Sequence, residues 1–130
     1  MENSSCLILI AHGSKDPRWR SPFERLEKAL KADLGNESIF LSYMEFANPT
    51  LLEASSRAVR TGAKKITVLP LFMAGGSHVD QDIPPQVAAV RKEFPGVEVE
   101  LLPPIGEHPK FVQLICQVAI ESAVQNQGVK

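Results

Sequence analysis

The chain has 130 residues, with 14 Lys and Arg against 15 Asp and Glu, a formal net charge of −1 and 44% hydrophobic residues. A chain of this length forms one domain, because domains usually contain about 100–150 residues, so a cleft between two domains of one copy is excluded. The near-balanced charge argues against a nucleic-acid-binding protein, which carries a clustered basic excess.

Hydropathy and cysteine usage indicate the compartment. No apolar run approaches the ~20 residues of a membrane-spanning helix, and the first residues lack the basic start of a secretory signal. Cys6 falls in an apolar run and Cys116 in a helical pattern, so we interpret both as small buried residues and not as a disulfide framework. We therefore expect a cytoplasmic protein with no membrane contact.

The first strand-helix unit occupies the start of the chain. Residues 6–11 form a short continuous apolar run, typical of a strand buried on both faces. After a polar loop, Ser21 and Glu24 form a capping-box pattern with Pro22 at the first helical position, which predicts a helix beginning at this point. Gly35 is placed to end it. The apolar residues of this predicted helix recur at helical spacing: Phe23, Leu26, Leu30 and Leu34.

Three further strands are predicted from apolar runs of similar length. They cover residues 39–46, residues 65–72 and residues 97–102. Each run is too short for a helix of ordinary length and is bounded by turn residues.

Three further helices alternate with these strands. Asn48 is the predicted N-cap of the second helix, and Asp82 caps a third over about residues 83–94. The last runs from residue 109 to about residue 125, and residues 125–130 are expected to form a disordered polar tail. The predicted core face of the last helix is Phe111, Leu114, Ile115 and Val118.

Strict alternation of strands and helices predicts the fold class. It is α/β, a three-layer, doubly wound, four-stranded parallel sheet with right-handed crossovers and helices on both faces. In such a sheet, ligands bind beyond the carboxyl ends of the strands, where the strand order reverses. The candidate site is therefore expected at this edge.

Three residues with metal-binding or acid-base chemistry follow the predicted strands. His12 follows the first strand, Glu45 ends the second, and His78 lies in the predicted loop after the third. A single histidine at a strand end is most often a hydrogen-bonding residue, but three such residues at one edge favour a site. Two imidazoles and a carboxylate suit Co²⁺, Fe²⁺, Ni²⁺ or Zn²⁺. Their wide sequence separation favours a catalytic or transient site over structural zinc.

A basic cluster lies in the first loop. Lys15, Arg18 and Arg20 form either a solvated loop or a cluster that binds the carboxylates of an anionic ligand. Trp19 lies inside this cluster, where it suits a planar ligand or fills a core or an interface.

Two other interpretations of the histidines have weaker support in the sequence. His108 precedes Pro109 and is interpreted as a helix-start residue, with a proton-relay role left open. Ala11-His12-Gly13 is similar to the Arg-His-Gly of histidine phosphatases, but Ala11 stands where the phosphate-binding arginine would be.

Three longer stretches resemble a known family. They are residues 7–16 (LILIAHGSKD), residues 43–51 (YMEFANPTL) and residues 69–84, which contain PLFMAGGSHVDQDIP. Together they resemble the small single-domain class II chelatases of the sirohydrochlorin cobaltochelatase and ferrochelatase type. The match covers nearly the whole chain in order and spacing, and the third stretch is its most specific part.

The resemblance implies a chelatase fold and an enzyme that inserts a divalent metal into sirohydrochlorin. Cobalt is expected first, with iron or nickel as alternatives, for cobalamin, siroheme or a nickel tetrapyrrole. His12 and His78 would be the metal-binding and catalytic histidines, and Glu45 their acidic partner, as metal ligand or proton acceptor. The metal would be a substrate, with no permanent cofactor, and Lys15, Arg18 and Arg20 would bind the carboxylates of the tetrapyrrole.

The resemblance also implies how copies of the chain assemble. A tetrapyrrole is wider than the edge of one four-stranded sheet, and larger relatives enclose it between two similar lobes, so we expect a homodimer with a shared cleft. Two other functions remain open: a metal or tetrapyrrole carrier without turnover, and phosphoryl transfer through His12.

Overall fold

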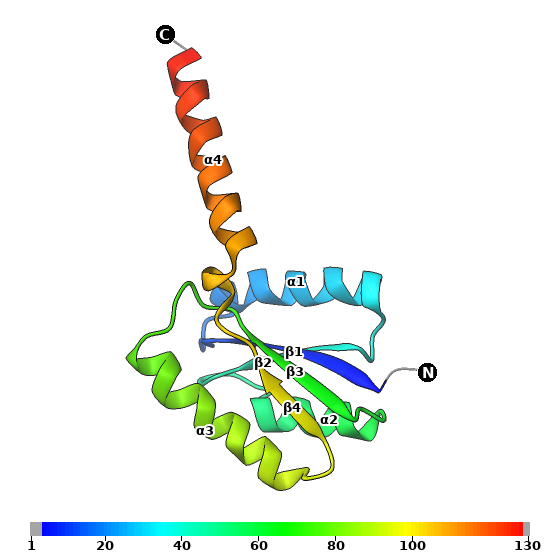
Figure 1. Cartoon of the computed structure of the whole chain (residues 1–130). Helices are drawn as coiled ribbons and strands as arrows, with labels where there is room; N and C mark the ends of the chain where they lie inside the picture. Colours follow the sequence, from blue (N-terminus) through cyan, green and yellow to red (C-terminus); the bar gives the residue numbers. More distant parts are fainter. Residues whose placement is uncertain (1–3, 129–130) are drawn as a thin grey trace.

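The computed structural model describes the backbone of residues 4–128 and the side chains of these residues except 77–80 and 126–128. Its elements alternate along the chain (Figure 1). In chain order they are β1 (Ser5–Ala11), α1 (Pro17–Leu34), β2 (Ile39–Tyr43), α2 (Leu51–Arg60), β3 (Lys65–Pro70), α3 (Ser77–Glu93), β4 (Glu98–Leu101), the short 3₁₀ helix η1 (Ile105–Glu107) and α4 (Pro109–Gly128).

The four strands form one parallel sheet in the order β2-β1-β3-β4. Leu9 of the central strand β1 is in register with Leu41 of β2 on one side and with Leu69 of β3 on the other. The strand order reverses between β1 and β3, so this is where an open sheet places its ligand. The predicted α/β class and parallel topology are confirmed.

Alternate residues of β1 pack on opposite faces of the sheet. Ile8 and Ile10 belong to the larger buried cluster, which includes residues of α2 and α3 such as Leu51 and Val87. Leu9 belongs to a smaller cluster on the face that α1 covers. Helices therefore cover both faces, but the cluster on the α1 face is smaller because only α1 contributes helical residues to it.

The start of α1 differs from the prediction. The helix begins at Pro17, with Asp16 as N-cap, and Pro22 lies inside it. Asp16 Oδ1 accepts a hydrogen bond from the amide of Arg18 at 2.9 Å. The predicted capping box at Ser21 was wrong because Asp16 already satisfies the free amide at the helix start. Pro22 costs the helix the hydrogen bond that a residue there would donate to the carbonyl of Arg18.

The second helix, in contrast, starts later than predicted. Thr50, and not Asn48, caps α2: Thr50 Oγ1 accepts from the Glu53 amide at 3.1 Å, and Glu53 Oε1 accepts from the Thr50 amide at 2.9 Å. This reciprocal pair is a capping box. β2 ends at Tyr43, before the predicted boundary, and Phe46 beyond it has a φ of 67°.

α3 begins six residues before the prediction, at Ser77 and not at Ile83. Its N-cap is Gly76, and Pro84 and Pro85 lie inside the helix. Asp82, the predicted N-cap, lies inside this helix, and Ile83, Val87 and Val90 further along it belong to the buried core. His78 is consequently in the first turn of a helix and not in the predicted loop.

α4 differs most from the prediction. It projects away from the sheet (Figure 1), and every residue from Val112 to Gln125 is exposed. The predicted core face was wrong: Leu114, Ile115 and Val118 are 45–56% exposed. Cys116 is exposed as well, whereas Cys6 is buried as predicted. The helix continues to Gly128, past the expected start of the tail.

The helices between residues 4 and 128 include none that is long and apolar enough to cross a membrane.

Candidate functional site

The backbone pairing of β1 and β2 continues past the ends of both strands. The Met44 amide donates to the carbonyl of Ala11 at 2.7 Å, and the Glu45 amide donates to the carbonyl of His12 at 3.0 Å. His12 is the first residue after β1 and Glu45 the second after β2, and the continued pairing places both at the carboxyl edge. His12 and Glu45 are neighbours because of this extended pairing, although 33 positions separate them in the sequence.

Gly13 allows the two segments to approach closely. Its φ is +99°, a conformation that residues with a side chain rarely adopt. A Cβ atom at this position would overlap the carbonyl oxygen of Glu45. Glycine is therefore required here both for its conformation and for the space it leaves.

The side chains of His12 and Glu45 contact each other directly. His12 Nε2 lies 2.9 Å from Glu45 Oε2, and the two side chains are 53% and 39% exposed. The other ring nitrogen, Nδ1, lies 3.1 Å from the carbonyl oxygen of Gly13. A carbonyl only accepts, so this contact places a proton on Nδ1 and leaves Nε2 as the nitrogen that exchanges a proton with Glu45 or binds a metal.

The spacing of this pair fits a divalent ion. Two ligands at about 2.0–2.1 Å from one metal, at an angle of about 90–109°, lie about 2.8–3.4 Å apart. The separation of 2.9 Å between Nε2 and Oε2 lies within this range. The pair can therefore hold a proton between its atoms, or a metal ion after a small shift.

His78 reaches the same edge of the sheet from another element. It follows β3 and lies in the first turn of α3, while its side chain lies outside the described residues. Among the described side chains, no three of His, Cys, Asp or Glu gather as a metal-binding group. The structure thus brings two of the three predicted ligands into contact.

An open cavity of about 660 Å³ lies next to His12. Three aromatic rings line it: Trp19, Phe23 and Phe46. Trp19 and Phe46 are 70% and 58% exposed, so their rings are accessible to a ligand. The Phe46 ring centre lies 6.2 Å from that of His12. The sequence pointed to Trp19, but Phe46 was missed because it was assigned to a strand.

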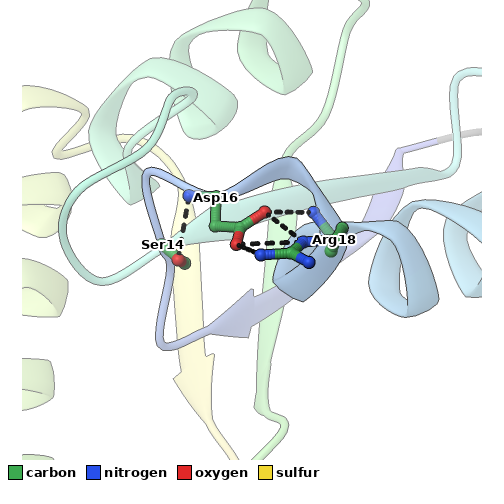
Figure 2. A network of polar contacts seen from close by, with 3 residues as sticks. All are labelled: Ser14, Asp16 and Arg18. Carbon is green, nitrogen blue, oxygen red and sulfur yellow. Dashed lines mark hydrogen bonds and ion pairs between the residues drawn. The ribbon is translucent and has the colours of Figure 1, made fainter.

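The three predicted cations of the first loop have different surroundings. Lys15 lines the cavity. Figure 2 shows Arg18 folded onto Asp16. Arg18 Nη2 donates to Asp16 Oδ2 at 2.7 Å, and Ser14 Oγ accepts a hydrogen bond from the Asp16 amide. Arg20 donates to the carbonyl of Ser14 at 2.8 Å. Lys15 is therefore the cation placed for a ligand in the cavity, while the two arginines hold the loop.

Arg18 also changes the titration of its partner. Its side chain and backbone amide both donate to Asp16, and these hydrogen bonds hold the pKa of that carboxyl below its usual value. The Asp16 carboxylate thus stays charged at the helix start, where negative charge is stabilising.

A second contact at this edge was not found by sequence reasoning. Glu107 Oε2 accepts a hydrogen bond at 3.0 Å from the amide of Gly75, in the segment that leads into α3. The Gly106 amide donates to the carbonyl of Phe72 at 2.9 Å. Hydrogen bonds from η1 therefore hold the segment that precedes His78 in place. A single carboxylate at a predicted loop gave no signal for this role.

His108 acts as a helix-start residue, as predicted. Its Nδ1 accepts from the amide of Lys110 at 3.1 Å. This contact satisfies one of the free amides in the first turn of α4.

The fold and the site define an α/β protein with a histidine-carboxylate pair beside a cavity at the switch edge of a parallel sheet. The chain belongs to the CbiX family, whose model matches residues 6–122.

Curated relatives carry chelatase names. The chain is 31% identical over 109 residues to the chloroplastic sirohydrochlorin ferrochelatase of Arabidopsis thaliana, a match that covers 84% of this chain and 48% of the relative. It is 30% identical over 126 residues to the sirohydrochlorin cobaltochelatase of Saccharolobus islandicus, covering 92% of this chain and 97% of the relative. The chain thus spans about half the length of the plant protein and nearly the whole of the archaeal one.

Solved structures share the fold. A CbiX protein of Marinobacter aquaeolei matches with a TM-score of 0.80 and 36% identity, over 93% of this chain and 98% of that chain. The sirohydrochlorin chelatase SirB of Bacillus subtilis, solved with cobalt, matches with a TM-score of 0.78 and 22% identity, over 91% of this chain and 50% of that chain. The predicted chelatase-like fold is confirmed.

Proposed function

We propose that this chain inserts a divalent metal, with cobalt first and iron or nickel as alternatives, into sirohydrochlorin. The observation that carries the proposal is the contact between His12 Nε2 and Glu45 Oε2 at 2.9 Å, at the edge of an open cavity. Membership of the CbiX family and relatives named as cobaltochelatase and ferrochelatase support the same reaction.

The cavity suits a flat, acidic substrate. Its volume of about 660 Å³ falls within the range of roughly 300–1,000 Å³ typical of ligand sites. The exposed rings of Trp19 and Phe46 provide flat apolar surface for a macrocycle. Lys15 lines the same cavity and is the first candidate for a substrate carboxylate. Arg18 and Arg20 would contribute positive charge near the loop.

The site residues account for the protons of the reaction. A metal that enters a free tetrapyrrole replaces two pyrrole N–H protons, so two protons must leave for each metal inserted. His12 Nε2 and Glu45 Oε2 first hold the metal and then, as it passes to the ring nitrogens, become free to accept protons. Neutral imidazole is a suitable metal ligand because its free ring nitrogen binds first-row ions and can accept a proton once the metal has left.

His78 is proposed as the third ligand. It follows β3, the strand on the opposite side of the switch point from β2, so the ligands would reach the metal from both sides. Its position in the first turn of α3 ties it to the segment that Glu107 fastens.

The working form is proposed to be a homodimer with a shared cleft. One edge of a four-stranded sheet supports a macrocycle from one side, and the cavity at His12 is open to solvent. The chain also spans only about half of the Arabidopsis and Bacillus proteins that it matches. Pairing of two copies would supply the second wall.

A metalation assay tests the function. Purified protein is mixed with sirohydrochlorin and Co²⁺, Fe²⁺ or Ni²⁺, and the change in visible absorption of the tetrapyrrole is followed against a protein-free control. Acceleration with several turnovers per chain is expected. Stoichiometric binding without turnover would identify a carrier, and no acceleration with any of the three metals would refute insertion.

A further inference from the structure

The peptide bond between Met44 and Glu45 is hydrogen-bonded on both sides. Its N–H, the amide of Glu45, donates to the carbonyl of His12 at 3.0 Å. Its C=O, the carbonyl of Met44, accepts from the side-chain amide of Gln86 in α3 at 3.2 Å. Because a carbonyl only accepts, the nitrogen of the Gln86 amide must face it. One peptide unit thus joins the loop after β1, the loop after β2 and α3.

The regular pairing of β2 with β1 ends next to this peptide. In a regular strand, successive backbone amides point to opposite sides, so only alternate residues bond to one neighbouring strand. Here the consecutive amides of Met44 and Glu45 donate to consecutive carbonyls, those of Ala11 and His12. The backbone is therefore twisted at Met44, and the carbonyl of this buried residue takes its partner from α3.

The residue after Glu45 adds strain to the same segment. Phe46 has a φ of 67°, in the left-handed region that large side chains rarely adopt. Such a conformation persists only where the surrounding contacts hold the backbone in place. The two hydrogen bonds of the Met44–Glu45 peptide lie directly before Phe46 and supply this restraint.

α3 provides a rigid platform for Gln86. The residues of α3 in the larger buried cluster, to which Met44 also belongs, are Ile83, Val87 and Val90. A side chain on a packed helix fixes the position of the group that it binds relative to that helix. Because the first turn of α3 carries His78, the Gln86 contact places Glu45 relative to the helix of the third proposed ligand.

We propose that Gln86 is a positioning residue, which holds the Met44–Glu45 peptide so that the carboxylate of Glu45 stays in contact with His12. The contact to be held is the 2.9 Å separation of His12 Nε2 and Glu45 Oε2. Displacement of a reacting group by about 1 Å can slow a reaction by roughly 100-fold. The consequence for metal insertion rests on the proposed function, whereas the restraint itself is a property of the backbone.

A groove beside the contact separates positioning from general stability. The residues that line this open cavity of about 270 Å³ are Met44, Thr50, Leu52, Gln86 and Ala89. If Gln86 is replaced, water in the groove can bond to the Met44 carbonyl, so little folding free energy is lost. Such a water does not fix the direction of the peptide. Loss of the Gln86 amide should therefore loosen the Glu45 segment while the fold remains stable.

Amide hydrogen exchange of the full chain, measured by NMR without metal or tetrapyrrole, tests the restraint. Gln86→Met keeps the side-chain length but has no donor. In this variant the Glu45 amide should exchange roughly two- to tenfold faster, the factor that loss of one hydrogen bond gives. The Leu71 amide, which donates to the carbonyl of Ile10 at 2.8 Å on the β3 side of the same edge, is the internal reference. Its exchange should stay unchanged.

Arg91→Met is the matched control. Arg91 also lies on α3, and its Nη2 donates to the Val99 carbonyl of β4 at 2.7 Å. The substitution removes a hydrogen bond of the same kind, from a side chain of α3 to a backbone carbonyl, but on a strand that does not lead to Glu45. Exchange at Glu45 should stay as slow as in the wild type.

The insertion assay then links the restraint to the reaction. Gln86→Met is expected to insert metal roughly tenfold more slowly than the wild type, or slower still, because Glu45 is no longer held beside His12. Gln86→Lys keeps an N–H donor and should recover slow exchange at Glu45 and most of the insertion rate. Arg91→Met should insert metal at the wild-type rate.

Three results would overturn the proposal. One is exchange at Glu45 that is as slow in Gln86→Met as in the wild type. Another is equal acceleration at Glu45 and Leu71, which would show that Gln86 adds only general stability. The third is a wild-type insertion rate in Gln86→Met despite faster exchange at Glu45. If the wild type inserts no metal at all, the proposed function is refuted, and the exchange measurement still decides whether Gln86 restrains Glu45.

Discussion

Gly13 lies against the carbonyl group of Glu45 so closely that no side chain fits between them. The contact joins the loop after β1 to the loop after β2, where His12 and Glu45 meet at 2.9 Å. Backbone packing at one glycine thus sets the distance between the side chains of two proposed site residues.

Gly13→Ala should separate His12 from Glu45. The new Cβ requires a displacement of the loop in addition to a strained φ, so we expect a loss of about 3 kcal/mol in the free energy of unfolding and a strong loss of metal insertion. Chemical denaturation and the metalation assay measure these effects.

Gly62→Ala is the matched control for this prediction. Gly62 has a φ of +101°, almost that of Gly13, but nothing lies within 4 Å of a Cβ placed there. It should cost only the backbone strain, about 1 kcal/mol, and leave insertion unchanged. Equal effects of the two substitutions would show that the contact with Glu45 is unimportant.

Substitution of the three proposed site residues should stop insertion without unfolding the protein. His12→Ala, His78→Ala and Glu45→Gln are each expected to lower the insertion rate by roughly 10²–10⁴-fold, the range for loss of a positioned acid-base group. His12 and Glu45 are exposed enough that little core packing is lost. Circular dichroism checks the fold, and unfolding of any of the three variants would favour a structural role for that residue.

Glu107 is expected to act as a positioning residue for the segment that carries His78. Glu107→Ala removes the acceptor for the Gly75 amide and should lower insertion several-fold. Glu107→Gln keeps an acceptor oxygen and should restore most of the rate. If the Gln variant is as slow as the Ala variant, the negative charge matters and the hydrogen bond does not.

The charge of Asp16 should make a pH-dependent contribution to stability. Its pKa in the folded protein is lowered by hydrogen bonds from Arg18, so its contribution is present above the pKa of the unfolded chain, about 3.9, and is lost as pH falls through the lower folded value. Asp16→Asn keeps an N-cap side chain but removes the charge. The difference in Tm between wild type and variant should be present at pH 6 and shrink below about pH 4.

The two cysteines should differ in reactivity. Cys6 is buried, burial raises the pKa of its thiol, and the nearby charge of Glu37 raises it further. Cys116 is exposed in the single chain. A thiol reagent should therefore modify Cys116 first, and Cys6 only when the core opens. Fast reaction of Cys6 in the folded protein would contradict the described core.

Much of the fold followed from local patterns. The run at residues 6–11 predicted a buried strand because continuous apolar residues need cover on both faces. Strict alternation with helices then required a parallel sheet. Boundaries failed where a nearby side chain provided a better cap: Asp16 replaced Ser21, and Thr50 replaced Asn48. Which of two nearby residues caps a helix depends on backbone geometry, and residue propensities alone do not predict that geometry.

By itself, the sequence determined the α/β class with a parallel sheet and the resemblance to chelatases, because residue type and period are local properties. It also predicted a site at one edge, with His12, Glu45 and His78 as metal ligands and with Lys15, Arg18 and Arg20 as cations for the carboxylates of a ligand. Only the tertiary structure decided that His12 and Glu45 touch, since that contact depends on parallel register and on Gly13. It alone showed that the apolar face of α4 is uncovered, because helical periodicity predicts that such a face is buried without specifying which surface buries it.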